Sequence, residues 1–342
     1  MARACEQSIA LLRPLYYVVG PDGPEYLQAV EAAFWPILGL MQCVAFVTLM
    51  SMTLTNIISL RNLSDPRKTF GSIRLFGTLS WMFAGFIVAY LLEPISPQML
   101  WLASVVSITL VVYSLTMLPH TPPSGRSSTI GELLGLPALT MLRDRGFAIF
   151  LFCAFGTSIV QQFYSLYANK FLTDIGAPRP TAIQTLAQMS EVFCMALLPF
   201  FFARFTVKQM MVVGLIGWVI RNALFATSFL PVVVGIALPL HGVCYSFFFV
   251  VATLYVDRNA PPHLRASAQG IFVFATSGLG ALLGNWLSAE VTAANTMNEV
   301  TNWHPVWLVP AGIASGLLLV FVNWFRVAPE PAPASPQVDA VR

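Results

Sequence analysis

One carboxylate, Glu191, lies deep within a long apolar stretch of this sequence, and the amide of Gln188 precedes it by three positions. Residues at i and i+3 share one face if the stretch is a helix. Ionisable groups in such surroundings are costly and mark functional sites by default. Because a carboxylate removed from water favours its neutral form, we predict that Glu191 binds and releases a proton. The alternative is a structural hydrogen bond between helices, or an ion pair with Arg221.

A second polar face follows from the spacing of Arg74, Thr78 and Trp81, which lie at i, i+4 and i+7. A guanidinium, a hydroxyl and an aromatic surface on one helix face can donate to, hydrogen-bond and stack on a polar ring. We therefore predict that these residues bind substrate. Alternatively, Arg74 belongs to the basic residues that flank apolar segments, and Trp81 packs in a core.

Two further helical faces carry polar side chains within apolar stretches. Gln162 and Ser165 share one of them, and His241 and Tyr245 lie one turn apart on the other. We predict that all four contact substrate. Amides also join neighbouring helices, and a buried histidine is often only a satisfied core side chain, so both structural alternatives stay open.

Arg221 and Asn222 also lie within an apolar segment. A charge there must face protein or a cavity, and we favour a structural role for this pair. The sequence contains no HExxH, Walker or GxSxG motif, and its five cysteines form no CxxC pair. We therefore predict no enzyme, cofactor or metal site.

The elements that must position these residues follow from composition. Hydrophobic residues make up 57% of the 342 residues and charged residues only 10%, whereas soluble domains carry about 25% charged residues. The apolar runs are continuous, which favours spanning helices of roughly 20 residues and argues against an alternating β-barrel. The net charge of +3 is too small to indicate a nucleic-acid partner. We predict an all-α polytopic bundle in a lipid bilayer.

Nine spanning segments are expected, three before and six after one long connection. They cover residues 32–60, 71–93, 98–118, 146–171, 181–204, 208–229, 231–256, 266–290 and 304–326. The predicted organisation is an irregular segment 1–30, a partial transmembrane half 31–118, a connecting loop 119–145, a six-helix half 146–327 and a disordered tail 328–342. No oligomeric state is predicted.

Basic residues gather in alternate connections between these segments. On one side they are Arg61, Arg67, Lys68, Arg74, Arg126, Arg143, Arg145, Arg204, Lys208, Arg258, Arg265 and Arg326. The opposite connections hold only Lys170 and Arg179. The excess of Lys and Arg on the cytoplasmic side of membrane proteins predicts a cytoplasmic C-terminus and a cytoplasmic connecting loop. With nine spans, the N-terminus would lie outside.

The order and spacing of several motifs resemble those of the bacterial nucleoside:proton symporters of the major facilitator superfamily. The motifs are Thr55-Asn56-Ile-Ile-Ser59, Arg74-Leu-Phe-Gly-Thr78, Ala187-Gln188-Met-Ser-Glu191, Trp218-Val-Ile-Arg221-Asn-Ala-Leu-Phe225, Leu264-Arg265-Ala-Ser-Ala-Gln269-Gly270, and Asn302-Trp303 with Val306-Trp307-Leu308. The resemblance runs from about residue 35 to residue 326. It implies a twelve-helix fold, of which this chain resembles the fourth to twelfth helices.

The resemblance also implies an inner-membrane protein that carries a nucleoside and a proton by alternating access. The cavity would lie between the two halves, with Arg74 and Thr78 on one side and Gln162, Gln188 and Glu191 on the other.

This chain departs from the family pattern at several of the resembling positions. Trp81 replaces the usual Phe, Ser165 replaces an Asn, and His241 replaces an aromatic. Tyr245 keeps the family's aromatic character, and the next residue, Ser246, replaces an Asp. If that Asp carries the proton in the family, this chain must rely on Glu191. These replacements leave open a transporter of another polar metabolite, such as a sugar or a purine derivative, and a truncated membrane protein that does not transport.

Overall fold

The computed structural model describes residues 23–91, 98–117, 120–121 and 136–326. Within these ranges the regular elements are helical, apart from one short hairpin. The first helices are α2 (Gly23–Asn62), α3 (Pro66–Leu91), α4 (Gln98–Met117) and the 3₁₀ helix η1 (Leu136–Arg143). The next are α6 (Arg145–Asp174), α7 (Pro180–Phe202) and α8 (Val207–Ala226). The last are α9 (Leu230–Val232), η2 (Val233–Ala237), α10 (Leu240–Cys244), η3 (Tyr245–Val250), α11 (Val251–Asn259), α12 (Arg265–Val273), η4 (Phe274–Gly280), α13 (Ala281–Ala294) and α14 (Trp303–Trp324).

Seven helical segments of the described chain are long and apolar enough to cross a membrane. They are Leu38–Asn62, Arg145–Asp174, Pro180–Phe202, Val207–Ala226, Leu240–Asn259, Arg265–Ala294 and Trp303–Trp324. Trp101–Met117 is a shorter apolar helix. The predicted all-α polytopic bundle is confirmed, whereas the number of nine spans stays a prediction.

Side-chain caps mark the starts of two helices, α6 and α8. Asp144 accepts a hydrogen bond from the Phe147 amide at the start of α6, with 2.7 Å between Oδ1 and N. Thr206 and Gln209 form a reciprocal capping box at the start of α8. Both arrangements satisfy amides that lack a partner in the first turn, which is why these helices begin close to the predicted positions.

Two parts of the predicted organisation need correction. Helix α2 begins at Gly23, so the irregular segment predicted for residues 1–30 is wrong from there on. Pro24 lies in the first turn, where a missing amide proton breaks no intrahelical bond. A hairpin that the sequence analysis did not predict joins β1 (Thr296–Met297) to β2 (Val300–Thr301). Its two turn residues, Asn298 and Glu299, have φ of 49° and 68°, as a tight hairpin turn requires.

Three stretches of the predicted organisation lie outside the described residues. They are residues 1–22, most of the connecting loop 119–145, and the tail 328–342. In the described part of that connection, the 3₁₀ helix η1 covers Leu136–Arg143.

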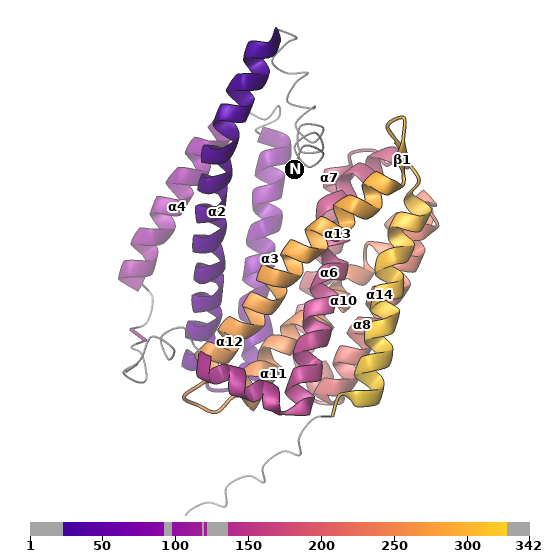
Figure 1. The fold of residues 1–342 in the computed structure, drawn as a ribbon. Coiled ribbons are helices and arrows are strands. Elements are labelled where there is room, and N and C mark those ends of the chain that lie inside the picture. Colours follow the sequence, from indigo (N-terminus) through magenta and orange to yellow (C-terminus); the bar gives the residue numbers. More distant parts are fainter. Residues whose placement is uncertain (1–22, 92–97, 118–119, 122–135, 327–342) are drawn as a thin grey trace, which may run out of the picture. The chain divides into compact units, whose positions relative to one another are not determined.

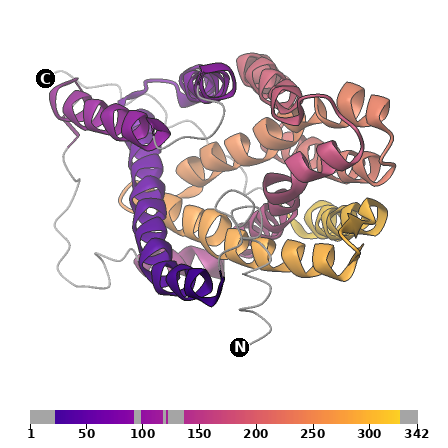
Figure 2. The same cartoon turned by 90° about the horizontal axis from the view of Figure 1, so that it is seen from above.

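Helices α6 to α14 pack around a core of aromatic side chains, including Phe150, Phe248 and Phe321. Helix α14 packs along α8 and α6, and α13 crosses α6 (Figure 1). Seen from above, helices α6 to α14, coloured from dark pink to yellow, gather into one bundle (Figure 2). Three π-helical segments, η2, η3 and η4, interrupt the later helices. Such segments occur frequently at functional sites, and η3 directly follows the helix that carries His241.

Helix α3 packs along α7. Gly71 of α3 lies so close to the Met195 carbonyl of α7 that an added Cβ would stand 3.0 Å from that oxygen. This close approach places the polar face of α3 against the polar face of α7.

Candidate functional site

The carboxylate of Glu191 lies where three helices meet. Its Oε1 accepts a 3.1 Å hydrogen bond from Thr78 Oγ1 on α3. Its Oε2 lies 3.7 Å from Nε2 of His241 on α10. The relative exposure of Glu191 is only 8% and that of His241 is 6%. Each oxygen of this buried acid therefore faces a polar group from a different helix.

Arg74 forms a second polar centre on α3. Its Nη1 donates to Asn56 Oδ1 across 3.3 Å, and its Nη2 donates to the Tyr245 hydroxyl across 3.0 Å. The guanidinium carbon lies 5.9 Å from the centre of the Tyr245 ring. Because Tyr245 begins η3 and Asn56 lies on α2, Arg74 joins elements from early and late parts of the chain.

Asn56 is the functional candidate that the sequence analysis missed. It belongs to the Thr55–Ser59 motif, to which no role was assigned. The available signal was an amide within the apolar segment 32–60.

Aromatic rings enclose the imidazole of His241. The centres of the Tyr164, Tyr245 and Trp218 rings lie 5.5, 5.7 and 6.5 Å from its own. These rings come from α6, η3 and α8. The imidazole is thus surrounded largely by aromatic rings, and its Nε2 lies 3.7 Å from the Glu191 carboxylate.

Arg221 is completely buried and lies against the same rings. Its guanidinium carbon is 3.9 Å from the centre of the Tyr164 ring, and its Nε donates to the Ala237 carbonyl across 3.2 Å. The neighbouring Asn222 donates to the Trp218 carbonyl across 2.7 Å. Among the described residues, the Glu191 carboxylate lies within 4 Å of the His241 imidazole, which forms an ion pair with it only when protonated, and no ion pair joins Glu191 to Arg221.

The other predicted binding residues are placed less centrally. Ser165 is exposed, and its hydroxyl donates to the Gln161 carbonyl of its own helix. Gln162 packs against Gly284 of α13, where an added Cβ would stand 2.7 Å from the glutamine Cγ. Gln188 is half-buried one turn before Glu191. The side chain of Trp81 lies outside the described residues.

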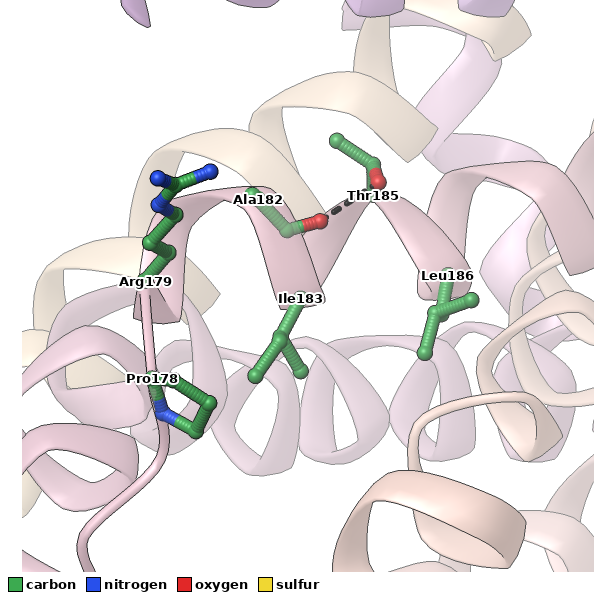
Figure 3. Close-up of a pocket in the computed structure, with 6 residues that line it drawn as sticks. All are labelled: Pro178, Arg179, Ala182, Ile183, Thr185 and Leu186. Atoms are coloured by element: carbon green, nitrogen blue, oxygen red, sulfur yellow. Dashed lines mark hydrogen bonds between the residues drawn. The ribbon is translucent and has the colours of Figure 1, made fainter.

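A separate pocket of about 500 Å³ opens at the start of α7 (Figure 3). It is lined by Pro178, Arg179, Ala182, Ile183, Thr185 and Leu186. The Thr185 hydroxyl donates to the Ala182 carbonyl and is therefore already satisfied. The pocket lies at the N-terminal end of α7, and Glu191 lies further along the same helix.

Comparisons with known proteins find a matching family model and several similar proteins. A family model described as "Nucleoside H+ symporter" matches residues 19–330. The chain is 33% identical over 324 residues to an Escherichia coli protein named as a nucleoside transporter, YegT, covering 88% of this chain and 75% of that protein. It is 28% identical over 310 residues to the nucleoside permease NupG of E. coli, covering 86% of this chain and 72% of the relative.

A third E. coli relative, xanthosine permease, is 29% identical over 333 residues, which cover 92% of this chain and 77% of the relative. Two crystal structures of the nucleoside transporter NupG, one of a mutant form, match with TM-scores of 0.64 and 0.60. Both are 28% identical, and each match covers 86% of this chain and 74% of the NupG chain.

Proposed function

The chain belongs to the nucleoside H+ symporter family, and we propose on that premise that nucleoside and proton meet at the cluster of Glu191, Thr78, Arg74 and Tyr245. Family membership makes it a proton-coupled nucleoside transporter of the inner membrane, not an enzyme. The proposal concerns which side chains of this chain carry out that transport.

The observation that carries the proposal is the pair of hydrogen bonds that α3 makes with later helices. Thr78 bonds to Glu191 on α7, and Arg74 bonds to Tyr245 on η3. Both bonds join a helix before the long connection to a helix after it. A substrate that binds between them can replace each bond with one of its own, so polar groups need not lose their partners. This matters because an unsatisfied buried polar group costs about 1–3 kcal/mol.

The chemistry of the cluster fits a nucleoside. The Glu191 carboxylate accepts hydrogen bonds from sugar hydroxyls, and the Arg74 guanidinium donates to carbonyl oxygens of a base. The Tyr245 ring offers a flat apolar surface on which a base can stack. Gln188 and Gln162 supply amides that both donate and accept, and we place them at the edge of the same site.

Glu191 is also the proposed proton carrier. Protonation removes the charge of Glu191 and converts one of its oxygens from an acceptor to a donor. The hydrogen bond that this carboxylate accepts from Thr78 changes as a result. Proton binding at this residue therefore changes the contact between α3 and α7. Such a change is what alternating access requires of the contacts between two halves.

We further propose that the C-terminus and the connection 119–145 lie in the cytoplasm, with a partial transmembrane half before that connection and a six-helix half after it. The support is the distribution of Lys and Arg among the connections. In this orientation the lipid bilayer surrounds the apolar helix faces.

Uptake of labelled uridine into liposomes that contain the purified chain tests the proposal. With an acidic exterior we expect accumulation above the external concentration, and with equal pH we expect only equilibration. Competition by a panel of nucleosides and sugars identifies the preferred substrate. Absence of uridine uptake by folded protein would overturn the proposal, and stronger competition by sugars would replace its substrate.

A further inference from the structure

We propose that His241 and Glu191 hold the coupled proton as a pair, so that His241 is a proton-binding residue of this transporter. This inference deepens the proposed function and rests on it. It assigns to His241 a role beyond substrate contact.

The first support is the geometry of the two side chains. His241 Nε2 and Glu191 Oε2 are 3.7 Å apart, and the two side chains are 8% and 11% exposed. A direct N–H···O hydrogen bond is about 2.9 Å long, so a shift of less than 1 Å brings the two atoms into contact. When a proton is added, the contact becomes a charge-assisted hydrogen bond, which is roughly twice as strong as a neutral one.

The second support is the way the backbone holds this pair together. The Gly242 amide of α10 donates to the Ser190 hydroxyl of α7 across 2.9 Å. A Cβ at Gly242 would overlap the backbone of Ser190. These two residues directly neighbour His241 and Glu191 in the chain. The helices α7 and α10 therefore approach each other closely beside the pair.

The third support is the charge around the pair. Arg74 on α3 acts on Glu191, and Arg221 on α8 acts on His241. The other titratable groups whose rings face the imidazole are Tyr164 on α6 and Tyr245 on η3. Arg74 attracts a negative charge at Glu191, and Arg221 repels a positive charge on His241. Because both side chains are buried, a lone charge on either is costly, whereas the protonated pair is neutral overall.

The same charges explain how the proton would be released. Arg221 repels the imidazolium at every stage, and the Glu191 carboxylate offsets that repulsion only while it faces the ring. When α3 moves away from α7, water reaches the pair and the proton leaves from Nε2 to a water molecule. One N–H bond forms as a proton enters from one side of the membrane, and the same bond breaks as it leaves to the other.

Ser246 strengthens the need for such a pair. It is fully buried within η3, and a serine hydroxyl does not change its charge at physiological pH. An imidazole can add and lose a proton at a ring nitrogen, and His241 supplies the imidazole of α10.

The steady-state accumulation ratio of uridine in proteoliposomes tests the inference. This ratio is an equilibrium property of coupling, so a variant that only binds more weakly or works more slowly still reaches it. For one proton per nucleoside, a gradient of one pH unit supports roughly tenfold accumulation, since a tenfold ratio corresponds to about 1.4 kcal/mol. Exchange of labelled for unlabelled uridine, which needs no gradient, is measured on the same vesicles.

The test variant is His241→Gln, whose amide can donate to Glu191 but does not titrate. The matched control is Tyr164→Phe, which alters the same ring cluster without removing a titratable imidazole. We expect His241→Gln to exchange uridine at a reduced rate and to show a ratio near one at every gradient. Tyr164→Phe should reach the ratio of the unmodified chain.

Three results would overturn the inference or its premise. If His241→Gln slowly reaches the unmodified ratio, His241 does not hold the proton. If neither His241→Gln nor His241→Tyr exchanges uridine, the imidazole serves binding instead. If the unmodified chain exchanges uridine without accumulating it, proton coupling itself fails, and this result separates failure of the proposed function from failure of the pair.

Discussion

The Thr78 hydroxyl of α3 donates a 3.1 Å hydrogen bond to the Glu191 carboxylate of α7. We expect Thr78→Val to lower kcat/KM for nucleoside uptake by roughly tenfold, because a hydrogen bond to a charged group contributes about 1.5–3 kcal/mol and tenfold is 1.4 kcal/mol. Thr78→Ser keeps the hydroxyl and is the matched control. Initial rates over a range of uridine concentrations measure both. A loss in Thr78→Ser with none in Thr78→Val would show that the methyl packing matters and the bond does not.

Arg74 makes two simultaneous bonds, to Asn56 and to Tyr245. The planar guanidinium presents several donors in a fixed geometry, which a lysine ammonium on a flexible stem does not reproduce. We therefore expect Arg74→Lys to weaken nucleoside binding more than Tyr245→Phe, which removes one bond and keeps the ring. Binding titrations of the purified variants measure the order. A larger loss in Tyr245→Phe would make the tyrosine hydroxyl, not the guanidinium, the main contact.

Spacing along one helix predicted which polar residues share a face, but it did not predict how the faces pair. Arg74 with Thr78, and Gln188 with Glu191, follow from the periodicity of a helix. Glu191 had two possible partners on later segments, and the sequence analysis considered Arg221. The structure pairs it with His241, while Arg221 lies over Tyr164. Which residue faces Glu191 depends on how α8 and α10 are rotated about their axes. The sequence of a helix that is apolar on all sides does not reveal this rotation.

Continuous apolar runs predicted the existence of the helical segments. Length and hydropathy alone define a spanning helix. They do not report π-helical interruptions such as η3. The hairpin at Asn298 and Glu299 is a different case, since two residues with positive φ form a turn that composition does not announce.

Gly242 supports the contact between α7 and α10. We expect Gly242→Ala to destabilise the protein, because its Cβ would overlap the Ser190 backbone and overpacking typically costs 1–3 kcal/mol. Gly235 in η2 is the matched control, since an added Cβ there meets nothing within 4 Å. Alanine at that helical position should be neutral or stabilising by about 0.5–1 kcal/mol. Thermal unfolding midpoints in detergent compare the two.

A Gly242→Ala protein that unfolds at the same temperature as the unmodified chain would contradict this packing. In that case α7 and α10 would not meet at Ser190, and the His241–Glu191 pair would lose its support.

Arg221 provides the sharpest distinction between a structural and a binding role. Its guanidinium is buried against Tyr164, with Trp218 and Phe225 at 5.4 and 5.0 Å. Stacking of a desolvated cation on aromatic rings contributes on the order of 2 kcal/mol. Arg221→Lys keeps the buried charge but loses the planar stack and the Nε bond to Ala237, so we expect a clear fall in the unfolding midpoint. Arg221→Met removes the charge and fills similar space, and replacing buried charges with apolar groups is often tolerated. The Arg221→Met protein should therefore have a higher unfolding midpoint than the Arg221→Lys protein.

Binding of uridine by the folded fraction of each variant completes the test, because loss of binding at an unchanged midpoint would assign Arg221 to the substrate site instead.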